Sequence, residues 1–195
     1  MTLWLVRHAR PLVESGVCYG ALDVAADSEA TAQAAHALAA ALPQGLPVAY
    51  SPLQRCEQLA QTLRWLRPDL TFKPDVRLVE MDFGQWEGVP WDQIPRAAMD
   101  AWTADFGEHC FGGVESANAV LRRVASAWHD TWSEMGEAGG RGAVWITHAG
   151  VIRAAMLISQ GVPAAVQAPS QWPRLAVDWG QWCCLASPHP GTGPG

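Results

Sequence analysis

The sequence predicts an α/β domain built on a largely parallel sheet. Short apolar runs alternate along the chain with longer segments whose apolar residues recur at helical spacing, and this is the order of elements in such domains. The chain has 195 residues, 49% hydrophobic and 16% charged, so it can bury one sizeable core but not two. We therefore expect a single domain over residues 1–187 and a disordered tail over residues 188–195, which are mostly proline and glycine.

The chain is expected to open with a strand, a helix and a second strand. LWLV at 3–6 and PVAY at 47–50 are apolar runs of strand length. Between them, the alanine-rich segment 28–42 has the composition of a helix, with Ser28 as its expected N-cap. Pro43 cannot continue a helix and marks its expected end.

A second helix is predicted over residues 51–66, entered directly from the preceding strand. Ser51 suits the N-cap, Pro52 suits the first helical position, and leucines recur at helical spacing. Arg55 therefore lies in the first turn of this helix. Residues 76–84, VRLVEMDFG, are expected to form another strand that opens into a loop.

The segment at about 81–113 is broken by proline and glycine into short helices, and we expect it to be a lid-like insert that covers a site. Residues 114–135 predict a long helix. AVWIT at 143–147 predicts a strand that is followed directly by a helix. The stretch 174–187 is expected to supply two final strands joined near Gly180.

Composition excludes several classes of partner. The formal net charge is −6 and the arginines form no run, so the sequence offers no basic surface for nucleic acid or an anionic membrane. The first apolar run is shorter than a secretory signal, and no window reaches transmembrane length. Five cysteines without CxxC spacing fit reduced thiols. These features lead us to expect a cytoplasmic protein.

Two common classes of hydrolase are not supported by any motif. The sequence contains neither HExxH nor clustered cysteine and histidine residues at zinc-ligand spacing, so we expect no metal site. It also lacks the G-x-S-x-G turn of many serine hydrolases.

Three predicted strands end in residues that suit an anion site. Arg7 and His8 follow the first strand, Ser51 leads from the second strand to Arg55, and His148 follows AVWIT. Because ligands bind beyond the carboxyl ends of parallel strands, these side chains can converge. Guanidinium groups match phosphate oxygens well, and helix N-termini at the same edge add free N–H groups. The sequence therefore predicts a phosphate pocket at this edge.

The chain resembles the histidine phosphatase superfamily, also called phosphoglycerate mutase-like. The resemblance implies a three-layer α/β/α sandwich with a mostly parallel sheet. It covers residue 3 to about residue 155, and GVCYGALDV and EMDFGQWEG are most similar to alpha-ribazole phosphatase and related small phosphatases. The stretches that match, in the order of the family, are LWLVRHA, SPLQRCEQLA, LVEMDFGQWEG, FGGVESANAVLRRV and VWITHAGVIRA.

The resemblance implies a role for each active-site residue. His8 is the nucleophile that becomes phosphorylated, Arg7, Arg55 and His148 hold the phosphoryl group, and Glu80 donates the proton to the leaving oxygen. Such a site needs neither metal nor cofactor. An imidazole attacks phosphorus through a neutral nitrogen, so its other nitrogen must be held by an acceptor.

Some positions leave alternatives open or depart from the family pattern. Asp82 and Glu87 lie close enough in sequence to Glu80 to be the proton donor instead. Ala9 replaces the usual glycine after the catalytic histidine, which is tolerable if its φ is negative. Glu14 replaces the usual asparagine, and we expect either that it points away from the phosphate or that the loop is rearranged.

The residues that select the substrate have two interpretations each. The tryptophans of the insert either stack on a flat heteroaromatic group or pack the insert against the domain. Glu115 and Ser116 either contact substrate or cap the long helix at its start. Cys18 and Tyr19, in the first loop, which follows the first strand, either line the substrate entrance or serve to pack this loop. The candidate substrate contacts are Cys18, Tyr19, Trp86, Trp91, Trp102, Glu115 and Ser116.

We expect a phosphomonoesterase that acts on a phosphorylated small molecule through a phosphohistidine. The resemblance favours alpha-ribazole 5'-phosphate, a substrate of cobalamin nucleotide-loop assembly. A phosphoglycerate mutase is the alternative, although the short insert argues against it. An inactive phosphate-binding regulatory module is a more distant alternative, because all five expected active-site groups are present. They are Arg7, His8, Arg55, Glu80 and His148.

Overall fold

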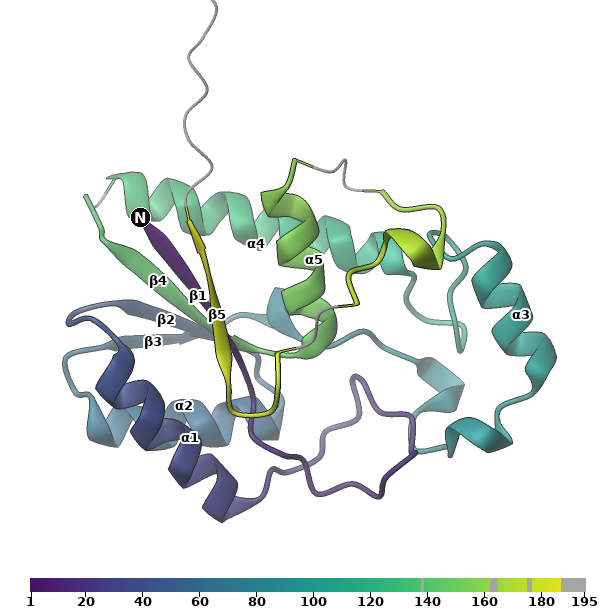
Figure 1. Ribbon diagram of the computed structural model, residues 1–195, viewed down its shortest axis with the longest axis horizontal. Helices are drawn as coiled ribbons and strands as arrows, with labels where there is room; N and C mark the ends of the chain where they lie inside the picture. Colours follow the sequence, from purple (N-terminus) through teal and green to yellow (C-terminus); the bar gives the residue numbers. More distant parts are fainter. Residues whose placement is uncertain (138, 162–164, 175–176, 187–195) are drawn as a thin grey trace, which may run out of the picture.

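The protein is a three-layer α/β/α sandwich around one five-stranded sheet (Figure 1). The computed structural model describes residues 1–137, 139–161, 165–174 and 177–186. The strand order is β3-β2-β4-β1-β5, and β5 alone is antiparallel to its neighbour. The predicted α/β class is therefore confirmed. The strands are β1 (Thr2–Arg7), β2 (Pro47–Tyr50), β3 (Thr71–Pro74), β4 (Gly142–Thr147) and β5 (Trp182–Ala186).

Helices pack on both faces of the sheet, and each face has its own hydrophobic core. The α1 and α2 helices pack against each other and cover one face, where Val6, Val48 and Ile146 are buried. The α4 and α5 helices cover the other face, over Leu5 and Trp145. The helices are α1 (Ser28–Ala41), α2 (Gln54–Leu66), α3 (Arg96–Ala104), α4 (Ala117–Glu137) and α5 (Ala149–Ser159).

The register of the central strands brings their carboxyl ends to one level. In the parallel pair of β1 and β4, Arg7 lies opposite Thr147, so His8 and His148 follow side by side. The β2 strand pairs with β4 at Tyr50, and Ser51 continues this pairing by donating its backbone N–H to Ile146. All six residues of β4 are buried, so this register is strongly specified by the two cores.

Two helix starts differ from the prediction. Asp27, not Ser28, is the N-cap of α1, because its carboxylate accepts a hydrogen bond from the backbone N–H of Ala30 at 2.8 Å. The α2 helix begins at Gln54, so Ser51 lies before the helix. Its hydroxyl is instead turned toward the buried His148. Arg55 lies in the first turn of α2, as predicted.

Two predicted strands are not formed as expected. The segment 76–84 is not a strand: Val76–Leu78 form a 3-10 turn, η1, which Asp75 caps, and an irregular stretch follows. The preceding TFKP forms the edge strand β3 instead. At the other end of the chain, β5 is the strand formed by the described residues of 174–187, and a turn at Trp179–Gly180 precedes it, whereas residues 175–176 and 187 of this prediction lie outside the described part. The tail predicted at 188–195 lies outside the described residues.

The segment 79–113 contains the expected short helices, which are η2 (Gly84–Trp86), η3 (Trp91–Gln93) and α3. It packs around a small separate cluster of Cys18, Ile94 and Phe111. In Figure 1 this segment lies beyond the carboxyl ends of the strands, next to the short helix η4 (Pro169–Gln171). Among the described helices, none has both the length and the apolar character needed to cross a membrane.

Candidate active site

A pocket of about 340 Å³ lies at the carboxyl ends of β1, β2 and β4. It brings together four residues that the sequence predicted, Arg7, His8, Arg55 and Glu80. A larger cavity of about 460 Å³ lies at the opposite end of the sheet, around Trp145, and contains none of these four residues. The pocket at the strand ends is therefore the candidate active site. The other residues that line it are Val17, Tyr19, Trp91, Ala149 and Arg153.

His8 is almost fully buried and presents one free ring nitrogen. Its Nδ1 lies 2.7 Å from the carbonyl oxygen of Ala9. A carbonyl can only accept, so Nδ1 carries the proton and Nε2 keeps its lone pair. Burial, and next the positive charge of Arg55, lower the pKa of His8 to about 3. The ring is therefore neutral near pH 7, which is the form that can act as a nucleophile.

His148 lies behind His8, with the two ring centroids 5.1 Å apart. Arg55 Nε donates to His148 Nδ1 at 3.2 Å, so the neutral ring carries its proton on Nε2. That nitrogen lies 2.8 Å from Ser51 Oγ, to which it donates. Burial and the charge of Arg55 hold the pKa of His148 well below its ordinary value. Here His148 orients Arg55 and Ser51, and it does not itself line the pocket.

Arg55 is a fully buried cation whose partners are neutral. Its guanidinium donates to the backbone carbonyls of Gly20 and Leu22, in the first loop, and to His148. Among the described residues, no carboxylate lies within 4 Å of it. Each terminal nitrogen keeps a second N–H for a ligand. Because a buried charge without a counter-ion is costly, an anion in the pocket is strongly favoured.

Arg7 adds the second guanidinium and is held by the segment before β5. Its Nη1 donates to the carbonyl oxygen of Val177 at 3.0 Å, and its guanidinium carbon lies 5.2 Å from the ring centroid of Trp179. Burial lowers the pKa of Arg7 from its ordinary value of 12.5. An arginine stays protonated even so, because its ordinary value lies far above neutral pH.

Glu80 is held at the pocket wall by backbone N–H groups. Its Oε1 accepts from Met81 at 3.0 Å, and its Oε2 accepts from Gly150, in the first turn of α5, at 2.9 Å. A Cβ atom on Gly150 would collide with this carboxyl group, so any larger residue there would force the carboxyl group to move. The sequence analysis did not identify Gly150. A glycine inside a predicted helix lowers the stability of that helix, so its presence there can indicate that another group lies close to the helix backbone.

The other two acids near Glu80 have structural partners. The Glu87 carboxylate accepts from the backbone N–H groups of Gly20, Ala21, Leu22 and Phe83, and it thereby ties the first loop to the segment 79–113. Asp82 accepts from the backbone N–H of Gly84. Neither acid lines the pocket. Of the three carboxylates that the sequence left open, Glu80 is the one beside His8.

Only some of the candidate substrate contacts lie in the pocket. Tyr19 and Trp91 line the pocket, and the Tyr19 ring lies 5.5 Å from the Arg55 guanidinium carbon. Cys18 and Trp86 pack instead around Phe111, away from the pocket. Glu115 pairs with Arg123 at 2.7 Å, and Ser116 accepts a hydrogen bond from Ala119 in the first turn of α4. Trp102 lines a neighbouring cavity. Val17 and Arg153 line the pocket without having been predicted.

The two departures in the first loop are accommodated. Ala9 is buried and its φ is not positive, so the absence of glycine there causes no strain. Glu14 is exposed, on a turn closed by a hydrogen bond from Val17 to its carbonyl oxygen, and it points away from the pocket as expected. Within the described part of the chain, no group of three His, Cys, Asp or Glu is placed to hold a metal ion.

Comparison with known proteins gives one family. The sequence matches the histidine phosphatase superfamily (branch 1) over residues 3–186. None of the curated proteins matches it.

Solved structures share the fold over almost the entire chain. A mycobacterial glucosyl-3-phosphoglycerate phosphatase in complex with VO3 is 25% identical, with a TM-score of 0.79 over 95% of this chain and 90% of that chain. A protein of Thermus thermophilus is 29% identical, with a TM-score of 0.70 over 96% and 95%. A candidate alpha-ribazole-5'-P phosphatase of Escherichia coli has the same fold at 24% identity, with a TM-score of 0.76 over 94% and 89%.

The buried His8 makes stability depend on pH. In the unfolded chain its pKa is about 6.5, whereas in the folded protein it is about 3, so the unfolded chain binds more protons between these values. The free energy of unfolding therefore falls as the pH decreases below 6.5. We expect His8→Asn to remove up to about 1.4 kcal/mol per pH unit of this decrease, measured by urea unfolding at pH 6.5 and pH 5. His129, with 83% of its side chain exposed, supplies the control His129→Asn. Equal slopes in both variants would contradict the assignment.

Proposed function

Because the chain belongs to the histidine phosphatase superfamily, we propose that it hydrolyses phosphomonoesters in two steps through a phosphohistidine at His8. It is a phosphatase, and its substrate is a phosphorylated small molecule. The observation that carries the two-step mechanism is the neutral, singly hydrogen-bonded His8 ring, which lies in one pocket with three guanidinium groups and a carboxyl group.

In the first step, the lone pair of His8 Nε2 attacks phosphorus while the bond from phosphorus to the leaving oxygen breaks. The proton stays on Nδ1 and keeps its hydrogen bond to the Ala9 carbonyl oxygen. This hydrogen bond stabilises the positive charge that develops on the ring. Arg7 and Arg55 face the oxygens of the transferred group from fixed positions, and one such preorganised donor contributes roughly 3 kcal/mol. His148 acts by holding Arg55.

Glu80 supplies the proton that the leaving oxygen needs. After this proton has moved to the leaving oxygen, the N–H groups of Met81 and Gly150 stabilise the carboxylate that forms. In the second step, Glu80 takes a proton from water as the water oxygen attacks the phosphohistidine. Inorganic phosphate leaves, and both His8 and Glu80 return to their starting states.

For the substrate, we propose a small 5'-phosphorylated riboside such as alpha-ribazole 5'-phosphate. The proposal is supported by the resemblance of residues 16–24 and 80–88 to alpha-ribazole phosphatases and by the aromatic residues beside the site. The fold shared with a mycobacterial glucosyl-3-phosphoglycerate phosphatase makes phosphorylated glycerates the natural compounds for comparison.

The nucleophile is tested by removing it. His8→Ala should lower kcat/KM by more than about a thousandfold, because no other described residue that lines the pocket is a histidine that could replace this imidazole as the nucleophile. Wild-type enzyme quenched in an alkaline denaturant should carry a phosphate on His8, detected by mass spectrometry and lost on treatment with acid, whereas the variant should carry none. His129→Ala serves as the exposed histidine control. Near-normal turnover by His8→Ala would refute the proposal.

The role of Glu80 is tested through Gly150, whose substitution pushes the carboxyl group from its place. Gly150→Ala should lower kcat for ethyl phosphate by about tenfold to a hundredfold. It should affect 4-nitrophenyl phosphate much less, because that leaving group departs without a proton. Gly136, in α4, has no atom near its hypothetical Cβ, so Gly136→Ala is the matched control. Equal losses with both substrates would show that Glu80 is not the proton donor.

A direct comparison of substrates tests the proposed preference. We expect kcat/KM to be highest for alpha-ribazole 5'-phosphate among phosphomonoesters that include glucosyl-3-phosphoglycerate and 3-phosphoglycerate. Incubation with phosphoglycerates should release inorganic phosphate. Transfer of phosphate between the glycerate positions would instead identify a mutase.

A further inference from the structure

A second cavity, of about 190 Å³, adjoins the active-site pocket. The two share Glu80, Ala149 and Arg153, so Glu80 forms part of the wall between them. Apart from Glu80 and Arg153, every residue that lines the second cavity is uncharged. We call it the aromatic cavity, because four rings form most of its wall: Phe83, Trp102, Phe106 and Trp172.

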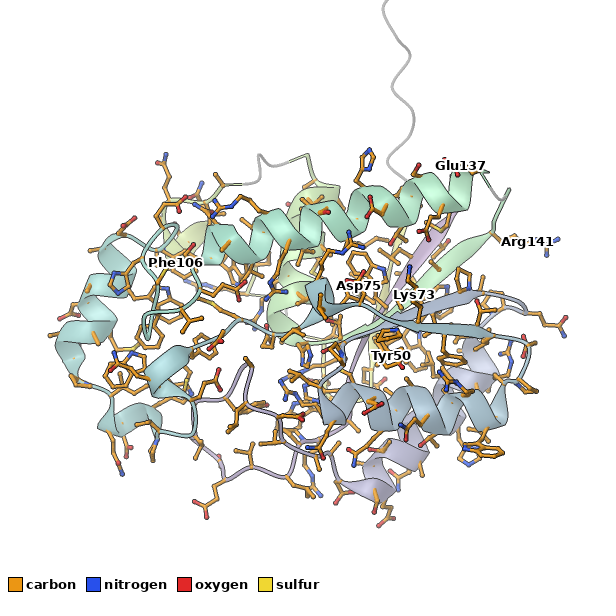
Figure 2. The ribbon with its side chains drawn as sticks, turned by 180° about the vertical axis from the view of Figure 1, so that it is seen from behind. Tyr50, Lys73, Asp75, Phe106, Glu137 and Arg141 are labelled. Atoms are coloured by element: carbon orange, nitrogen blue, oxygen red, sulfur yellow. The ribbon has the colours of Figure 1, made fainter. Side chains whose placement is uncertain are left out.

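Three of the four rings belong to the segment 79–113 and the fourth, Trp172, follows η4, and the four contact one another in a row. Phe83 lies 6.2 Å from Trp102, Trp102 stacks on Phe106 at 5.5 Å, and Phe106 meets Trp172 edge-on at 5.9 Å, all measured between ring centroids. Figure 1 shows why they meet, since α3 lies beside η4, just before Trp172. In Figure 2, Phe106 lies in this part of the molecule, far from Glu137 and Arg141 at the other end.

Arg153 lies where the two cavities meet, because it lines both of them. Among the described residues, no hydrogen bond or ion pair involves its side chain, and its Nε atom is buried without an acceptor. The phosphate dianion is matched by Arg7 and Arg55. The charge and the donors of Arg153 are therefore left for other oxygen atoms of the substrate.

We propose that the aromatic cavity holds a flat apolar ring on the leaving alcohol, while Arg153 binds oxygens of the chain that joins this ring to the phosphate. This inference rests on the proposed function, because it places the leaving oxygen beside Glu80. The group attached to that oxygen begins at the wall that the two cavities share. An apolar cavity of about 150 Å³ can bind benzene, so the aromatic cavity has room for one ring.

The proposal is tested with two esters whose leaving alcohols are similar in acidity, benzyl phosphate and ethyl phosphate. Only the first carries a ring. We expect the wild-type enzyme to favour benzyl phosphate by at least about tenfold in kcat/KM, because burial of a ring is favourable. Benzylphosphonate should inhibit more strongly than ethylphosphonate by a similar factor, and this second measurement needs no variant.

Ala117→Leu tests the location, because Ala117 is buried in the first turn of α4 and lines the aromatic cavity but not the active-site pocket. The larger side chain should take the place of the ring. We expect the preference for benzyl phosphate to fall about tenfold, with little change in kcat/KM for ethyl phosphate. Ala101→Leu, at an exposed position of α3, is the matched control and should leave both values unchanged.

Trp91→Ala separates this proposal from the alternative that the ring lies on the outer wall of the active-site pocket, which Trp91 lines. Its control is Trp65→Ala, at a tryptophan that is 88% exposed. Loss of the preference in Trp91→Ala but not in Ala117→Leu would overturn the proposal. Equal turnover of both esters with a normal phosphohistidine would also overturn it and leave the proposed function intact. Failure to form a phosphohistidine at all would remove both.

Discussion

The site depends on one buried positive charge that the described residues do not neutralise. Arg55 lies in the first turn of α2 and donates to two backbone carbonyls and to a neutral histidine. Removing a guanidinium from water without a counter-ion is costly, so this part of the fold is built at the expense of stability. A phosphate dianion removes that cost when it binds. The same charge helps to keep both histidines deprotonated, so it prepares the nucleophile as well as the anion site.

The register of the strands places the other polar groups of the site next to this charge. The ends of β1, β2 and β4 are level because the alternating side chains of β4 must enter two different cores. A slip of one residue would reverse the faces of Trp145 and Ile146 and would move the polar groups out of line. The precision of the pocket is thus a consequence of hydrophobic packing several residues away. Glu87 fixes the loops of the site in a similar way. Its carboxylate accepts hydrogen bonds from backbone N–H groups of both the first loop and the segment 79–113.

Much of this arrangement follows from the sequence, and the remainder depends on tertiary contacts. Arg7, His8 and Arg55 were predicted because they follow apolar runs of strand length, and such runs end at one edge of a parallel sheet. The strand predicted around Glu80 is wrong because Asp75 caps a 3-10 turn there, and local hydrophobicity does not reveal a cap. Similarly, the composition does not tell whether Asp27 or its neighbour Ser28 is the N-cap of α1. The hydrogen bond from Ala30 to the Asp27 carboxylate, seen only in the structure, decides it. The division of the tryptophans between the active-site pocket, the aromatic cavity and the packed cluster could not be read from spacing, because segments distant in sequence form each of these groups.

The support of Arg7 by Val177 and Trp179 joins positions about 170 residues apart. During translation Arg7 and His8 are made well before the segment that steadies the guanidinium and before the β5 strand, which pairs with β1. A nascent chain on the ribosome therefore carries its nucleophile long before it has a finished anion site. The anion site is complete only after the segment that contains Val177 and Trp179 has packed against Arg7.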